Sequence, residues 1–168
     1  VLAAADGGLK VGIAWTSGLE RAERAACRTR LADWSPLAAV PGATLVNLQY
    51  GDVEAETLAT EAAWGRKILR WPGLDLRDDL EETAALCLAL DLVVAVPTAV
   101  GELAAAVGAP VWRLTPPGDW TLLGAAARPW FRERGGAIEA GWTPERIDAE
   151  AGASGDRREA GRELDAVA

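Results

Sequence analysis

The sequence is most informative at first through what it lacks. It contains no histidine and no methionine, and its two cysteines, Cys27 and Cys87, form no CxxC pattern. Without histidine, Ser-His-Asp catalysis, a histidine base and His-ligated zinc are excluded. Two widely separated cysteines in a chain of this size indicate reduced thiols in a cytoplasmic protein. A chain that starts at Val1 and has no methionine is expected to be a fragment of a longer polypeptide.

Long apolar runs and excess positive charge are missing as well. No apolar run is long enough to span a bilayer, and no basic-then-apolar signal peptide opens the chain. The formal net charge is −8, so the surface should repel nucleic-acid phosphates and anionic lipid. We therefore expect no nucleic-acid partner, no membrane insertion and a cytoplasmic location.

Strand and helix patterns alternate along the chain, in which 50% of the residues are hydrophobic. Strands are predicted over residues 10–15, 44–50, 67–71, 91–96 and 110–114. Helices are predicted between them, over residues 34–40, 53–64, 79–90 and 98–107, with caps at Asp33, Asp79 and Thr98. The alternation predicts an α/β fold: a Rossmann-like, doubly wound parallel sheet with helices on both faces. This domain is expected over residues 1–150 and includes a helix at 142–150. A linker at 151–155 and a terminal helix at 156–168 would follow.

The first candidate site lies in the turn after the first strand. Ligands of such sheets bind at the carboxyl ends of the strands. Thr16 and Ser17 supply hydroxyls that can bond an oxyanion, and Gly18 allows close backbone approach. A plain turn between strand and helix is the alternative interpretation.

The second candidate site is the start of the helix at 98–107. The free N–H groups of Thr98, Ala99, Val100 and Gly101 can hold a phosphate without basic side chains. Glu102, one turn into the helix, can bond a ribose hydroxyl or act as a general base. Ordinary capping and a favourable carboxylate in the first turn are the alternatives for both features.

Two further groups of residues are candidates for ligand binding. Trp112 and Arg113 lie in the last predicted strand. Asp119 and Trp120 lie in the loop after it, where they could contact a sugar or base. An acidic cluster is a possible metal site, although a capped and solvated helix start is the favoured interpretation. The cluster consists of Asp75, Asp78, Asp79, Glu81 and Glu82.

Several segments carry a family resemblance. KVGIAWTSG, ATLVNLQYGD and DLRDDLEETAALCLALDLVVAVPTAVGELAAAVGAPVWRL come in that order, followed by GDW and RPWF. Over roughly residues 10–131 they resemble the C-terminal domain of glycosyltransferase family 9-like modules joined to tetratricopeptide repeats in bacteria. Heptosyltransferases are related to these modules.

This resemblance implies the C-terminal half of a GT-B fold, in which two Rossmann-like domains face a cleft. The turn at Thr16, Ser17 and Gly18 would border the cleft, and the helix start at 98–101 would face the donor phosphate. Trp112 and Arg113 would lie near the base. The nucleotide sugar is then a substrate, and neither a separate cofactor nor a metal is expected. The partners would be an N-terminal domain, the repeats, and a protein or glycan acceptor.

The resemblance has two departures, which leave more than one function open. Pro97 and Glu102 stand where the heptosyltransferase-like pattern commonly has aspartate and histidine. Some similar repeat proteins modify flagellin with nonulosonic acids from CMP donors, which carry a single phosphate. The first hypothesis is therefore the nucleotide-sugar-binding half of a transferase, inactive alone. The second is a catalytically degenerate docking module attached to the repeats. The third, a dehydrogenase half, is disfavoured because no GxGxxG follows the first strand.

Overall fold

The structure is a computed structural model that describes residues 8–18, 27–115, 123 and 137–139. In chain order the elements are β1 (Lys10–Ala14), the 3-10 helix η3 (Leu31–Trp34), α1 (Ser35–Ala39), β2 (Thr44–Asn47), α2 (Glu54–Trp64), α3 (Leu80–Leu88), β3 (Leu92–Ala95), α4 (Ala99–Ala106), β4 (Val111–Thr115) and β5 (Ala137–Glu139). None of the helices in these ranges has the length and apolarity needed to cross a bilayer.

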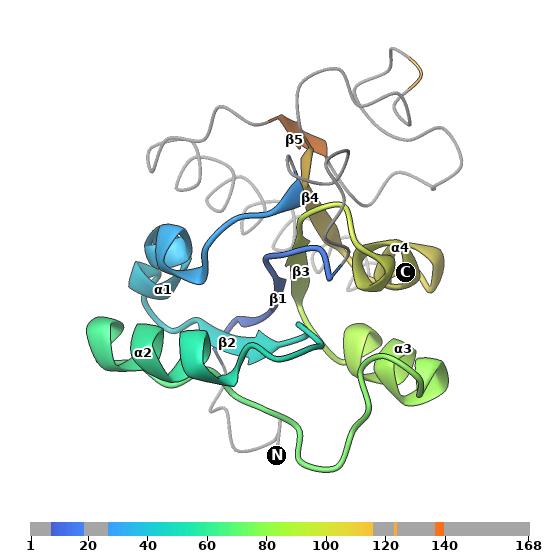
Figure 1. Cartoon of the computed structure of the whole chain (residues 1–168). Helices are drawn as coiled ribbons and strands as arrows, with labels where there is room; N and C mark the ends of the chain where they lie inside the picture. The colour runs from blue at the N-terminus through green and yellow to red at the C-terminus, as the bar shows by residue number, and fades with distance from the viewer. Residues whose placement is uncertain (1–7, 19–26, 116–122, 124–136, 140–168) are drawn as a thin grey trace, which may run out of the picture.

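The strands form one parallel sheet in the order β2-β1-β3-β4-β5. β1 lies between β2 and β3, so that Val11 is opposite both Leu45 and Leu92. Figure 1 shows α1 and α2 on one side of the sheet and α3 and α4 on the other. Helices on both faces of a parallel sheet confirm the predicted Rossmann-like, doubly wound α/β fold.

The strand predicted over residues 67–71 is wrong in extent but right in position. It is reduced to a single parallel bridge between Leu69 and Val46 of β2. The Leu69 N–H donates to the Leu45 carbonyl at 2.8 Å, and the Asn47 N–H donates to the Leu69 carbonyl at 2.8 Å. With this segment counted at the edge, the strand order in the chain's own sequence becomes 3-2-1-4-5-6, the order of dinucleotide-binding sheets.

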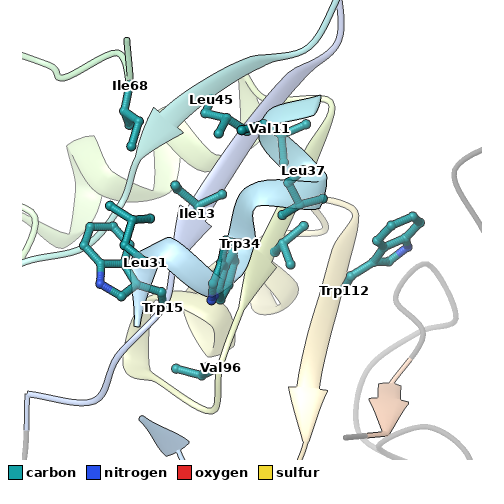
Figure 2. Packing of buried hydrophobic residues seen from close by; sticks show 12 residues of the cluster. Val11, Ile13, Trp15, Leu31, Trp34, Leu37, Leu45, Ile68, Val96 and Trp112 are labelled. Atoms are coloured by element: carbon teal, nitrogen blue, oxygen red, sulfur yellow. The ribbon is translucent and has the colours of Figure 1, made fainter. Parts of the chain in front are cut away.

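Two apolar clusters fill the space between the sheet and its helices. On the face covered by α1, Ile13 and Leu45 of the sheet pack against Leu31 and Trp34, as Figure 2 shows. On the face covered by α3 and α4, Val93 packs with side chains of both helices, including Cys87. Alternate strand residues therefore face opposite clusters, as expected of strands buried on both sides.

The predicted caps at Asp79 and Asp33 have opposite outcomes. Asp79 caps α3, because its Oδ1 accepts from the Glu82 N–H at 3.1 Å, and Gly65 ends α2 with a left-handed φ of 63°. The predicted cap at Asp33 is wrong. Asp33 lies inside η3 and its carboxylate accepts from Arg30 at 2.8 Å instead.

Most of the predictions for the C-terminal part of the chain fall outside the residues that the structure describes. The helix at 142–150, the linker at 151–155, the terminal helix at 156–168 and the loop residues Asp119 and Trp120 lie outside the described residues. The three-residue strand β5 was not predicted.

Candidate functional site

The topology brings the two candidate sites to neighbouring strand ends. The chain leaves β1 toward β2 on one side, and later returns to β3 on the other side of β1. The carboxyl ends of β1 and β3 therefore flank the point where the strand order reverses, which is where open α/β sheets bind ligands. The turn at 16–18 follows β1, and the segment at 98–101 follows β3.

The backbone of the turn after β1 is already hydrogen-bonded within the protein. The Thr16 N–H donates to Gln49 Oε1 at 3.0 Å, and the Ser17 N–H donates to the Cys27 carbonyl at 3.1 Å. These two amides are thus engaged, and Ser17 is buried. Gly18 is exposed, and a Cβ there would lie 3.3 Å from the ring of Tyr50. Of the three predicted residues, Gly18 is the exposed one, and it lies close to the ring of Tyr50.

The end of β2 is held rigidly beside that turn. Gln49 also donates through Nε2 to the Tyr50 carbonyl at 3.0 Å, and its N–H donates to Asn47 Oδ1 at 3.1 Å. The Asn47 amide in turn donates to the Gln49 carbonyl at 3.1 Å. The position of Tyr50 is therefore set by a side-chain network that also binds Thr16.

The start of α4 has one buried hydroxyl and several backbone N–H groups that the helix itself does not bond. Thr98 occupies the N-cap position with extended backbone, yet its side chain makes no capping hydrogen bond. Its hydroxyl is buried and has no hydrogen-bond partner among the residues that the structure describes, and Thr98 is only 5% exposed. The first-turn N–H groups of Ala99, Val100 and Gly101 have no carbonyl partner within the helix. A buried hydroxyl without a partner destabilises the protein by about 1–3 kcal/mol unless something binds it.

The residues of this first turn do not all face the same way. Ala99 is exposed, whereas Val100 is buried in the cluster beneath α4. A Cβ on Gly101 would lie 3.0 Å from the Ala95 Cβ, so this glycine allows α4 to approach β3 closely. Gly101 therefore sets the position of the helix start, and Ala99 is the residue of this turn that is exposed and lines the cavity described next.

A cavity of about 240 Å³ opens beside this helix start. Its lining includes Tyr50, Leu76, Thr83, Ala99, Val100 and Leu103. Thr83 is fully buried and its hydroxyl, like that of Thr98, has no hydrogen-bond partner. Apolar atoms make up most of the lining, and the charged residues Arg77 and Asp78 border the cavity as well. Such a lining, with one aromatic ring, suits a flat, partly polar group.

Sequence reasoning missed Tyr50 and Thr83. Tyr50 was detectable, because it follows β2 and so lies at the same carboxyl edge as the predicted residues. Thr83 lies in the first turns of α3, and nothing in its local sequence separates it from an ordinary buried helix residue.

Glu102 and Arg113 were predicted as separate ligand-binding residues, and the fold pairs them. Arg113 Nη1 donates to Glu102 Oε1 at 2.5 Å. The Arg113 side chain is 6% exposed and that of Glu102 is 39% exposed. A buried guanidinium requires such a counter-charge. The pair links the first turns of α4 to β4 and engages the carboxylate that was predicted as a base.

Trp112 and Arg113 point to opposite faces of the sheet, as successive strand residues do. Trp112 packs in the cluster under α1, where Figure 2 shows it to one side of the others. Arg113 therefore lies on the α4 side of the sheet, where it pairs with Glu102, and Trp112 lies on the α1 side.

The acidic residues between 75 and 82 do not form a metal-binding group. No cluster of three or more potential metal ligands occurs within the part of the chain that the structure describes. Asp75 Oδ1 accepts from the N–H groups of Arg77 and Asp78 at 2.9 and 3.1 Å, which lowers the pKa of Asp75. Asp79 caps α3. The interpretation of this cluster as a capped helix start is confirmed for Asp79.

Comparison with known proteins finds one similar protein over most of the chain. The chain is similar to Protein FlbA of Caulobacter vibrioides. The two are 43% identical over 124 residues, which make up 74% of this chain. The chain spans only 21% of the length of FlbA. No known family matches the chain, and no solved structure matches it.

Proposed function

We propose that this domain binds the nucleotide of an activated sugar and forms the C-terminal half of a GT-B glycosyltransferase. The observation that carries the proposal is the start of α4. There, a buried Thr98 hydroxyl without a partner and first-turn amides without acceptors stand beside a cavity at the reversal of strand order. Such a helix start binds phosphate through N–H groups and the positive end of the helix dipole.

The cavity suits the nucleoside part of such a donor. The Tyr50 ring offers a surface for stacking, and the unpartnered Thr83 hydroxyl offers a hydrogen bond. A volume of about 240 Å³ is too small for a whole nucleotide sugar, so the sugar would extend toward a second domain. Tetratricopeptide repeats and an N-terminal Rossmann-like domain remain part of this proposal.

In the proposed reaction, the bond between the anomeric carbon and the donor phosphate oxygen breaks. An acceptor hydroxyl on a protein or glycan, such as flagellin, bonds to that carbon and loses its proton to a base in the second domain. Fixed N–H groups at Ala99 and Val100 stabilise the negative charge that develops on the departing phosphate. We place the reaction in the cytoplasm, consistent with two buried, free cysteines.

Nucleotide binding is testable on this chain by NMR titration with CMP, UDP and ADP at millimolar concentration. We expect the largest amide shifts at Ala99, Val100 and Gly101. Ala99→Asp should abolish these shifts, because it places a carboxylate where the phosphate binds. The variant should still fold, because an acidic side chain in the first turn of a helix interacts favourably with the helix dipole. Ala62→Asp is the matched control. Ala62 is exposed on α2, across the sheet, and the variant has the same net charge.

Two results would contradict the proposal. One is the absence of shifts at residues 98–102 with all three nucleotides. The other is an equal loss of binding in the Ala99→Asp and Ala62→Asp variants. Such a result would show that the loss comes from the added net charge and not from the position of the carboxylate.

A docking module is the second candidate function, and Glu102 favours it. Its carboxylate stands in the first turns of α4, where it repels a phosphate even while Arg113 neutralises part of its charge. If the three nucleotides fail to bind, this second function becomes the better account of the fold.

A further inference from the structure

The helix α3 has an apolar stripe on its outer surface that the fold does not use. Its inner side buries Thr83, Leu86 and Cys87 against the sheet. Its outer side carries Leu80 and Leu88, which are 56% and 57% exposed. These two residues are two helical turns apart, with Ala84 between them on the same side. Figure 1 shows α3 on the outside of the molecule, next to α4.

The N-terminal end of this stripe is strongly acidic. Five exposed carboxylates lie between residues 75 and 82, against one guanidinium, that of Arg77. Asp75 and Asp79 bond to backbone N–H groups, and the Asp78 carboxylate lies 4.0 Å from Arg77. Glu81 and Glu82 are exposed on the first turn of α3, beside Leu80. Apolar residues bordered by charge of one sign characterise a surface that binds a partner of the opposite charge.

We propose that the outer face of α3 binds a basic amphipathic helix of a protein partner. Apolar side chains of that helix cover Leu80, Ala84 and Leu88, and its lysines or arginines face Glu81 and Glu82. The charge identifies the occupant, because a second copy of this acidic chain, a nucleic acid or an anionic membrane would each be repelled. The N-terminal end of the stripe also borders the cavity of the proposed donor site, through Arg77, Asp78 and Leu80. Ala84, Leu88 and the carboxylates of Glu81 and Glu82 do not line that cavity.

The contact should be weak and transient. A helix of nine residues is about 14 Å long and offers far less area than a stable complex requires. We therefore expect a dissociation constant on the order of 100 μM for an isolated helix, with an affinity that falls as salt is raised.

The test uses two synthetic helical peptides that share leucines at every fourth position. One carries lysine at the flanking positions and the other glutamate. We expect the lysine peptide to shift the NMR signals of α3 and the glutamate peptide to leave them unchanged. Leu88→Ser should weaken binding of the lysine peptide about tenfold, and Glu81→Gln with Glu82→Gln should weaken it several-fold.

Leu58→Ser is the matched control, because Leu58 is 48% exposed on α2, on the other side of the sheet. It should leave binding within twofold of the unmodified chain. The proposal is overturned if the two peptides bind equally, if Leu58→Ser weakens binding as much as Leu88→Ser does, or if no shift occurs. If the lysine peptide binds but none of the three nucleotides does, the docking surface stands and the proposed donor site is wrong.

Discussion

Glu61 shows how a single side chain ends the sheet at its β2 edge. Leu69 uses its N–H and carbonyl to pair with β2, so the neighbouring Ile68 N–H points away from the sheet. Glu61 Oε1 accepts from that N–H at 2.7 Å. The Ile68 N–H lies at the edge where another strand could pair with the sheet, and the Glu61 carboxylate of α2 accepts its hydrogen bond instead. The Glu61 carboxylate therefore closes the outer edge of this segment to a further strand.

Glu61 also makes stability depend on pH. Burial alone would raise its pKa, but the Ile68 N–H, Lys67 and Arg70 together lower the pKa below the ordinary 4.5. Lys67 Nζ and Arg70 Nη1 lie 3.2 and 3.3 Å from its carboxylate oxygens. Because the folded pKa is depressed, the stabilisation is present above the ordinary value and is lost as pH falls through the folded one.

We expect Glu61→Gln to lower the free energy of unfolding by about 2 kcal/mol at pH 7, since hydrogen bonds to a charged group are lost. The gap should narrow as pH falls below 4.5 and through the lowered pKa of Glu61, because the carboxyl is then protonated in the folded protein as well. Urea unfolding of both proteins between pH 3 and pH 7 measures this. Asp33→Asn, which breaks an exposed pair with Arg30, serves as the control and should cost less than about 1 kcal/mol. A gap that is independent of pH would contradict the assignment.

At the scale of elements, two helix starts look alike in sequence and differ in structure. Asp79 and Thr98 both occupy N-cap positions, but only Asp79 accepts a hydrogen bond from its helix. Asp79→Ala should therefore lower stability by about 1 kcal/mol. Thr98→Val should change it by less than about 0.5 kcal/mol or increase it, because a buried hydroxyl without a partner is removed.

Thermal or urea unfolding of the two variants checks this contrast, and the NMR titration extends it. If Thr98 serves a ligand, Thr98→Val keeps its stability while the nucleotide-induced shifts at Ala99 and Val100 become smaller. A loss of about 1 kcal/mol or more in Thr98→Val would instead show that the hydroxyl caps α4.

Local patterns predicted most of the elements, because each rests on interactions within a short stretch. The unbroken apolar run before Pro97 predicts β3, and Gly108 followed by Pro110 predicts the end of α4. The 3-10 helix at Leu31–Trp34 was not predicted, since Glu56 of α2 fixes it by accepting from the Leu31 N–H at 2.8 Å. Such a distant acceptor leaves no signal in the local sequence.

The candidate site was predictable only in part for the same reason. The rule that ligands bind at strand ends places Thr98 and Gly18 at one edge of the sheet from the sequence alone. It does not reveal that Arg113 pairs with Glu102, or that the amides of Thr16 and Ser17 are already bonded. Those facts depend on contacts between separate elements and loops, which the local sequence does not record.

At the scale of the whole molecule, one sheet carries two separate apolar clusters, one on each face. The central strands β1 and β3 contribute to both, with Ile13 and Val94 in one cluster and Ala14 and Val93 in the other. Because neither face can separate from the sheet without exposing these strands, we expect both clusters to unfold in one cooperative transition.

Cys87 provides a probe of that cooperativity. It is fully buried under α3, and burial raises the pKa of its thiol to about 11. At pH 8 the native thiol is therefore both inaccessible and protonated, so a thiol reagent reacts only after opening. In a Cys27→Ser variant, we expect the labelling of Cys87 to accelerate with urea as steeply as global unfolding does. Labelling that is fast and insensitive to urea would show instead that α3 opens by itself. In that case, the outer face proposed to bind a partner would belong to a helix that separates locally from the sheet.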